Sequence, residues 1–286
     1  MLKFQLAATI NGSAVSLDLC NNDTFVLLEA DLGFPEVRKV VDDKANQHGA
    51  FDNSMYFGSR AVTADVLVKQ GALISFAQAL DMVATFTRPD INITLTYNLG
   101  AGHVDRMMYL KAAGASGKAT SFSNREMQLQ FTAADPFCYA TAATTGSLLP
   151  DSFALSGRSY DEVYDKTYPA GTGSNYTATV TSSVSAQPVI TVYGPVASDL
   201  VIGNYSSGKL MSFTTLVLAL GEFVIIDMKN RTALVGGTWG SNAYGSIEWS
   251  GSEWWELNPG QNLVYYGGAV SAGAYATISW NVRFLT

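Results

Sequence analysis

Alternating apolar and polar residues dominate the first half of the chain. The alternation runs through residues 2–6 and again through residues 15–19, with Asn11-Gly12 between them. Asn-Gly flanked by alternating residues is a strong hairpin signal, because both residues tolerate the positive φ of a tight turn. The same period predicts further strands at residues 62–68, 91–97, 106–111 and 126–131.

One segment has helical periodicity instead. After Gly71, apolar residues recur at intervals of three and four as far as Ala84, and Arg88-Pro89 ends the pattern. This spacing predicts a single α-helix over about residues 72–87, whose apolar stripe covers one face of a sheet.

The pattern also divides the chain. A strand ends at Asp135-Pro136, because proline donates no ladder hydrogen bond, and small polar residues follow it. We therefore predict a mainly β protein. Its first domain, residues 1–139, is β-sandwich-like with one α-helix and a long arm. A connector spans residues 140–186, and a second domain spans residues 187–286.

The second half shows strand patterns separated by Gly, Asn and Pro, without a helical segment. This succession is typical of a β-sandwich or jelly roll. The strands are predicted at residues 188–194, 209–218, 222–227, 261–266 and 275–284.

A long polar excursion at residues 41–59 interrupts the first domain. It reads as a loop rich in Asp, Asn and Gly, yet it contains Phe51, Met55, Tyr56 and Phe57. A loop of this length inside a compact domain is usually functional or disordered. Its aromatic residues favour an arm that docks on another molecule, so we expect these four side chains at a subunit interface.

Composition narrows the class of protein. The 286 residues are 48% hydrophobic and 14% charged, which is globular and sufficient for two domains. The net charge of −7 argues against nucleic acid as a partner. No apolar run is long enough to span a membrane, and the first residues show no secretory signal pattern. Cys20 and Cys138 favour two isolated thiols over a disulfide.

Residues 203–209 have the G-x-x-x-x-G-K spacing of a nucleotide-binding loop. Leu210, however, stands where the motif needs Ser or Thr to reach a metal ion. A strand is predicted after the motif, where phosphate binding requires a helix N-terminus. We interpret this segment as a β-turn.

Other catalytic groups are equally sparse. His48 and His103 have no cysteine or carboxylate at metal-ligand spacing. Asp161, Glu162 and Asp165 form an acidic run, which favours a solvated surface over a glycosidase carboxylate pair. We predict no catalytic residues, metal or cofactor, and hence no enzyme.

Tryptophans gather in the second domain, and their role is open between two interpretations. Trp239, Trp254 and Trp255 either pack in a core or interface, or form an exposed platform for docking or for stacking on sugar rings. Because Trp254 and Trp255 are adjacent, an extended segment turns one inward and the other outward. Trp280 lies on the core side of its strand.

The order of several segments resembles the distal tail protein (Dit) family of long-tailed, siphovirus-type bacteriophages. They are the glycine-rich arm at 48–62, the single helix with the strand that begins at Ile91, the closing segment 133–139, and the motifs at 187–195, 225–227 and 255–262. In the last of these, Pro259-Gly260 matches the family as a structural turn.

The resemblance implies a structural protein of the virion tail tip, with a galectin-like β-sandwich as the second domain. It implies a homo-oligomeric ring of six-fold symmetry that joins the tail tube to the tip, baseplate and host-adhesion apparatus. The implied partners are the tail tube protein, the tape measure protein, a tail-associated tip protein and a receptor-binding protein. Synthesis in the host bacterial cytoplasm is expected. The alternative function is a carbohydrate-binding module of the adhesin or lectin type that uses exposed tryptophans.

Overall fold

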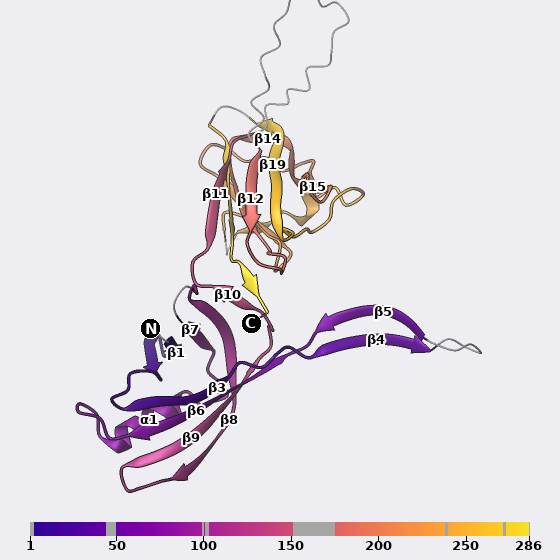
Figure 1. Cartoon of the computed structure of the whole chain (residues 1–286). Coiled ribbons are helices and arrows are strands. Elements are labelled where there is room, and N and C mark those ends of the chain that lie inside the picture. Colours follow the sequence, from indigo (N-terminus) through magenta and orange to yellow (C-terminus); the bar gives the residue numbers. More distant parts are fainter. Residues whose placement is uncertain are drawn as a thin grey trace, which may run out of the picture. The chain divides into compact units, whose positions relative to one another are not determined.

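The computed structural model describes residues 3–43, 50–98, 100, 103–150, 175–237, 240–270 and 273–285. These residues form a mainly β structure with one α-helix (Figure 1). The chain divides into two compact units. Unit 1 consists of Met1–Thr141 and Phe284–Thr286, and unit 2 consists of Ala142–Arg283. The chain therefore leaves unit 1 after Thr141 and rejoins it at Phe284.

Unit 1 is built on one large antiparallel sheet with the strand order β2-β1-β7-β8-β9-β6-β3. Short strands β10 and β21 pair with each other beside this path, and β10 also pairs with β8. The strands are β1 (Lys3–Ile10), β2 (Ser13–Asp18), β3 (Phe25–Asp31), β6 (Arg60–Lys69), β7 (Ile93–Asn98), β8 (Arg106–Ala119), β9 (Asn124–Ala133), β10 (Cys138–Ala140) and β21 (Arg283–Phe284).

The predicted first hairpin is confirmed. Strands β1 and β2 are antiparallel, and Ile10 faces Ser13 across the turn. Asn11 and Gly12 both have positive φ, 49° and 80°, which is the geometry that favours this dipeptide in tight hairpins.

Alternation along β6 builds the core of unit 1, as its sequence predicts. Val62, Ala64, Val66 and Val68 are all fully buried. They belong to a continuous cluster with apolar residues of β1, β7 and β9 and with Val83 of the helix. Burial of this face fixes the register of the sheet, because a slip of one residue would turn every side chain outward.

The helix α1 (Phe76–Thr85) is shorter than the predicted 72–87. Ser75 is its N-cap: the Ser75 hydroxyl accepts from the Gln78 backbone, and the Gln78 side chain accepts from the Ser75 backbone. This capping box sets the first turn. Leu73 therefore lies outside the helix and is 95% exposed.

The prediction of a loop at residues 41–59 is wrong. Strands β4 (Val37–Asp43) and β5 (Ala50–Phe57) form an antiparallel hairpin that pairs with no other strand among the described residues (Figure 1). A two-stranded ribbon does not need the alternation of a sheet that covers a core. The hairpin therefore gives no period-two signal, although it is regular.

Unit 2 contains two antiparallel sheets, with orders β11-β20-β13-β16-β17-β18 and β12-β19-β14-β15. They meet at Tyr176 of β12 and Trp280 of β20, whose rings are 6.3 Å apart. Its elements are β11 (Thr144–Leu148), β12 (Tyr176–Val180), β13 (Val189–Tyr193), β14 (Val196–Asn204), β15 (Lys209–Phe213), β16 (Phe223–Asp227), β17 (Thr232–Val235), β18 (Ser241–Asn242), the 3-10 turn η1 (Tyr244–Ser246), β19 (Gly260–Val270) and β20 (Tyr275–Trp280).

The connector predicted at 140–186 differs from this arrangement. Its described part contributes β11, which pairs with β20, and β12, which pairs with β19, so both strands belong to unit 2. Unit 2 thus begins well before the predicted boundary at 187.

Two strands predicted in unit 2 also differ from the structure. The single strand predicted at 275–284 divides into β20 and β21, and β21 carries the chain back to unit 1. The strand predicted at 209–218 ends at Phe213.

Candidate functional site

The four residues predicted at a subunit interface all lie on β5. Tyr56 faces Arg38 across the hairpin and is 62% exposed. Phe57 is 45% exposed, and its ring contacts that of Phe137 edge to face at 5.9 Å. Phe51 and Met55 share the strand, but their side chains lie outside the described residues. The hairpin therefore presents at least two large aromatic side chains to solvent.

The predicted tryptophan platform is only partly assembled. Trp255 is 1% exposed and belongs to the core of unit 2, while the adjacent Trp254 is half-buried. Trp280 is 2% exposed and lies in the core, as its strand position predicts. Trp239 lies outside the described residues. Of the three platform residues, Trp254 alone is seen to reach the surface.

Trp254 belongs instead to a cluster with Tyr244 and Trp249, which we call the aromatic cluster. The ring centroids are 5.7 Å apart for Tyr244 and Trp249, 6.0 Å for Tyr244 and Trp254, and 6.4 Å for the two tryptophans. Trp249 is 48% exposed and Tyr244 is half-buried. The aromatic cluster therefore combines one residue of η1 with two residues of the loop that follows it.

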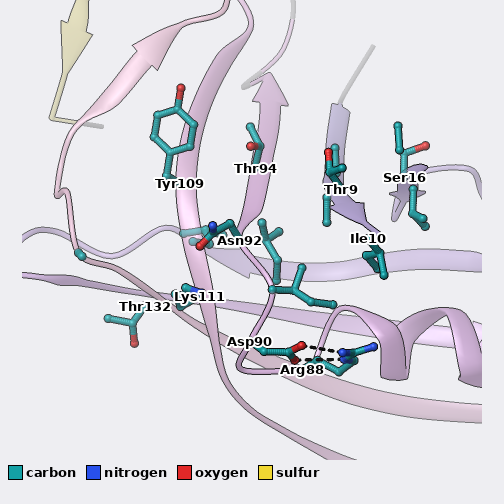
Figure 2. A pocket seen from close by; sticks show the side chains of 18 of the residues that line it. Thr9, Ile10, Ser16, Arg88, Asp90, Asn92, Thr94, Tyr109, Lys111 and Thr132 are labelled. Atoms are coloured by element: carbon teal, nitrogen blue, oxygen red, sulfur yellow. Dashed lines mark hydrogen bonds and ion pairs between the residues drawn. The ribbon is translucent and has the colours of Figure 1, made fainter. Parts of the chain in front are cut away.

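A broad depression of about 990 Å³ lies on the solvent face of the unit 1 sheet. Figure 2 shows Tyr109 of β8, Thr94 of β7, Thr9 of β1 and Ser16 of β2 along it. The strand register places Ser16 opposite Ala7, Ala7 opposite Thr94, and Thr94 opposite Tyr109. Small side chains on adjacent strands leave this face hollow.

Two charged groups of the depression, Arg88 and Asp90, form an ion pair. Arg88 donates to both carboxylate oxygens of Asp90, at 2.6 and 3.1 Å, and the two side chains face each other at its edge (Figure 2). The hydrogen bond from Arg88 lowers the pKa of Asp90, with Lys111 a further positive neighbour. The exposed ion pair and the threonines near it do not form a nucleophile with an adjacent base.

The described residues offer no metal or nucleotide site. No three His, Cys, Asp or Glu side chains gather among them in a way that could hold a metal ion. Within residues 203–209, residues 205–208 form the turn between β14 and β15, with Gly208 at φ 70°, which confirms the β-turn interpretation. The acidic run at 161–165 and His48 lie outside the described residues.

Both cysteines are free thiols, as expected. No helix in the described part is long and apolar enough to cross a membrane.

One charged side chain is completely buried in unit 1. Arg60 is 0% exposed. Its Nη1 donates to Cys138 Sγ at 3.0 Å, and its Nη2 donates to the carbonyl oxygen of Leu285. Nε has no hydrogen-bond partner in the described structure. Arg60 thus fastens the returning end of the chain to β6, and its role is structural.

The turn predicted at Pro259-Gly260 is held by a buried amide. Gly260 has φ 92°, a conformation that favours glycine. Asn262 is 0% exposed; its Oδ1 accepts from the Asn258 backbone at 2.9 Å, and its Nδ2 donates to the Asn258 carbonyl at 2.7 Å. Asn204 donates to the same Oδ1 at 3.1 Å. The turn therefore positions β19 and contains no reactive group.

Comparison with known proteins gives this fold a family context. Residues 181–284 match the family model described as siphovirus-type tail component, C-terminal domain. The crystal structure of the Dit protein of phage SPP1 aligns over 99% of both chains, at 13% identity and a TM-score of 0.67. Its description presents that protein as a paradigm of the hub adsorption apparatus in phages that infect Gram-positive bacteria.

A chain of the phage P2 baseplate in its activated conformation with calcium also aligns, over 98% of both chains, at 11% identity and a TM-score of 0.48. No curated protein matches the chain. The assignment therefore rests on the family model for unit 2 and on the fold shared with the SPP1 protein along the whole chain. Residues 181–284 therefore carry the C-terminal domain of siphovirus-type tail components, and the chain as a whole shares its fold with the SPP1 Dit protein.

Proposed function

We propose that this protein forms a ring-shaped hub at the tail tip, joining the tail tube to the tip apparatus. The observation that carries the proposal is the fold shared with the SPP1 hub protein over 99% of both chains. We infer a homo-oligomer, six-fold by resemblance. The tail tube, tape measure, tail-associated and receptor-binding proteins are its proposed partners.

The geometry of unit 1 supports self-association. Strands β2 and β3 end the sheet and have a neighbour on one side only in the described structure. Unpaired strand edges are natural sites for pairing with another chain. The β4–β5 hairpin adds Tyr56 and Phe57, whose exposed rings gain free energy when a neighbour covers them. A head-to-tail contact of this kind closes into a ring when its rotation permits.

We predict that the double variant Tyr56→Asp/Phe57→Ser loses the ring. Each change removes exposed aromatic area, and the new carboxylate would be desolvated at the interface. Native mass spectrometry and negative-stain microscopy of the full chain should show rings for the wild type and monomers for the variant.

The matched control is Phe122→Ser. Phe122 is 107% exposed at the turn between β8 and β9, in the same unit but away from the hairpin in sequence. We expect this variant to keep the ring. Rings of normal size in Tyr56→Asp/Phe57→Ser, or equal loss in both proteins, would refute the role of the hairpin.

We further propose that the protein has no catalytic activity. Asp90 in the depression of unit 1 is bound by Arg88, and Asp135 accepts a hydrogen bond from Tyr139, so neither carboxylate is placed to activate a nucleophile. We expect no turnover when the full chain is screened with glycoside, ester and peptide substrates. Turnover that disappeared in Asp161→Ala or Glu162→Ala would contradict this proposal.

A further inference from the structure

The aromatic cluster is carried by a segment that is fixed against unit 2. Residues 246–253 run along β15 and form backbone hydrogen bonds with it. The Thr214 amide donates to the Ser246 carbonyl at 2.9 Å, and the Glu248 amide donates to the Ser212 carbonyl at the same distance. The rings therefore stand on a preorganised support, which reduces the entropy that a ligand would have to remove on binding.

The surroundings of the rings are polar. Ala243 and Ile247, the aliphatic residues of the segment 241–254, are buried beneath it. Apart from Trp249, the exposed residues of this segment are Ser241, Asn242, Gly245, Glu248, Ser250, Gly251 and Glu253. The surface thus combines aromatic faces with hydrogen-bonding groups and has no exposed aliphatic residue.

Specific groups at the rim are suited to bind hydroxyls. Hydrogen bonds from Ser250 lower the pKa of the Glu248 carboxyl, so this acceptor is ionised near neutral pH. Lys209 Nζ lies 3.0 Å from the Glu253 carboxylate, and both side chains are about half exposed. Glu248 and Glu253 immediately precede Trp249 and Trp254 in the chain, so hydrogen-bonding groups adjoin the aromatic residues in the sequence.

Two other ligand classes fit this surface less well. A quaternary ammonium ion needs open space between aromatic faces. Here the centroids lie within 6.4 Å of one another, so the rings contact each other and leave no room for a cation. The buried centre of a protein interface is normally depleted in Glu and Ser, which are the residues that surround these rings.

We propose that the aromatic cluster is a saccharide-binding site, with Trp249 as the stacking platform for a β-pyranoside ring. The axial C–H groups of such a sugar form an apolar, weakly positive face that matches the negative face of an aromatic ring. The sugar hydroxyls at the edge of that face then meet polar groups such as Glu248, Asn242 and the Lys209–Glu253 pair. Exposed aromatic faces with polar neighbours suit a ligand that has both an apolar face and hydroxyl groups. The inference goes beyond the structural role in the tail and depends on unit 2 alone.

The test uses the full chain with methyl β-D-glucopyranoside and methyl β-D-galactopyranoside as probes. Saturation-transfer NMR should show contact with at least one of them, strongest at the ring protons of the stacked face. Trp249→Leu keeps an apolar side chain but loses the aromatic face, and we expect it to weaken binding about tenfold. Trp249→Phe retains a ring and should retain most of the binding.

Tyr205→Leu is the matched control, since Tyr205 is also 48% exposed and stacks on Tyr265 at 3.9 Å elsewhere in unit 2. It should bind as the wild type does, and melting curves show whether each variant is folded. The proposal is overturned if neither glycoside gives saturation transfer at millimolar concentration, if folded Trp249→Leu binds normally, or if Tyr205→Leu loses binding equally. None of these outcomes bears on ring formation, which is measured separately.

Discussion

Replacing Trp280 by alanine is expected to lower the free energy of unfolding of unit 2 by about 3–5 kcal/mol. The indole is 2% exposed, and Tyr176 of the opposing sheet packs against it edge to face. Removal of so large a side chain leaves a cavity between the two sheets that neighbouring residues fill only in part. By contrast, Trp254→Ala should cost less than about 1 kcal/mol, because surface substitutions usually have small effects.

Urea denaturation followed by tryptophan fluorescence measures this difference. All five tryptophans lie in unit 2, so the fluorescence transition reports that unit. The remaining tryptophans still provide the signal in each single variant. Equal and large losses in Trp280→Ala and Trp254→Ala would show that Trp254 is as much a core residue as Trp280.

Arg60→Lys is expected to destabilise unit 1 by about 3–5 kcal/mol. A lysine retains the charge at this fully buried position, but its single ammonium cannot reproduce the forked contacts with Cys138 and Leu285. Arg60→Met should cost less, because a flexible apolar side chain fills similar space without a buried charge.

Unit 1 contains no tryptophan, so circular dichroism must follow its unfolding. The Arg60→Lys variant should shift a transition seen by circular dichroism and leave the fluorescence transition of unit 2 in place. If Arg60→Met were the less stable of the two proteins, the guanidinium contacts would contribute more than the buried charge costs.

Elements that pack one face against a core could be predicted from the sequence. The hairpin at Asn11-Gly12 and the buried face of β6 follow directly from period two, because in each case one side of the strand meets the core. The presence of α1 was equally predictable. Its start was not, because the N-cap is Ser75, two residues after Leu73, and Leu73 itself continues the apolar pattern.

Elements without a buried face could not be predicted from the alternation of apolar and polar residues. Strands β4 and β5 pair only with each other among the described residues, so nothing in the structure imposes alternation on them. Strand β11 has the sequence TTGSL, in which only Leu148 is buried, and its place beside β20 depends on residues about 130 positions away. The strand end at Pro136 and the small polar residues after it do indicate the unit boundary near Thr141, whereas the return at Phe284 leaves no local signal.

The candidate sites show the same limit. Alternation within one segment could be predicted, but contacts between separate segments could not. Period two separates Trp255 from Trp254, because neighbours on an extended segment face opposite sides. It does not bring Tyr244, Trp249 and Trp254 together, because a 3-10 turn and an irregular loop separate them. Their association depends on hydrogen bonds to β15, which no spacing rule anticipates.

The bond between Arg60 and Leu285 also sets an order of events during protein synthesis. The two residues are 225 positions apart, and at about 5–20 residues per second a ribosome needs roughly 10–45 s to travel between them. Residues 142–283 emerge in that interval, so unit 2 has the opportunity to fold first. Until Leu285 leaves the ribosome, the guanidinium of Arg60 lacks that carbonyl acceptor. A prematurely terminated chain would therefore lack this hydrogen bond at a fully buried guanidinium in unit 1.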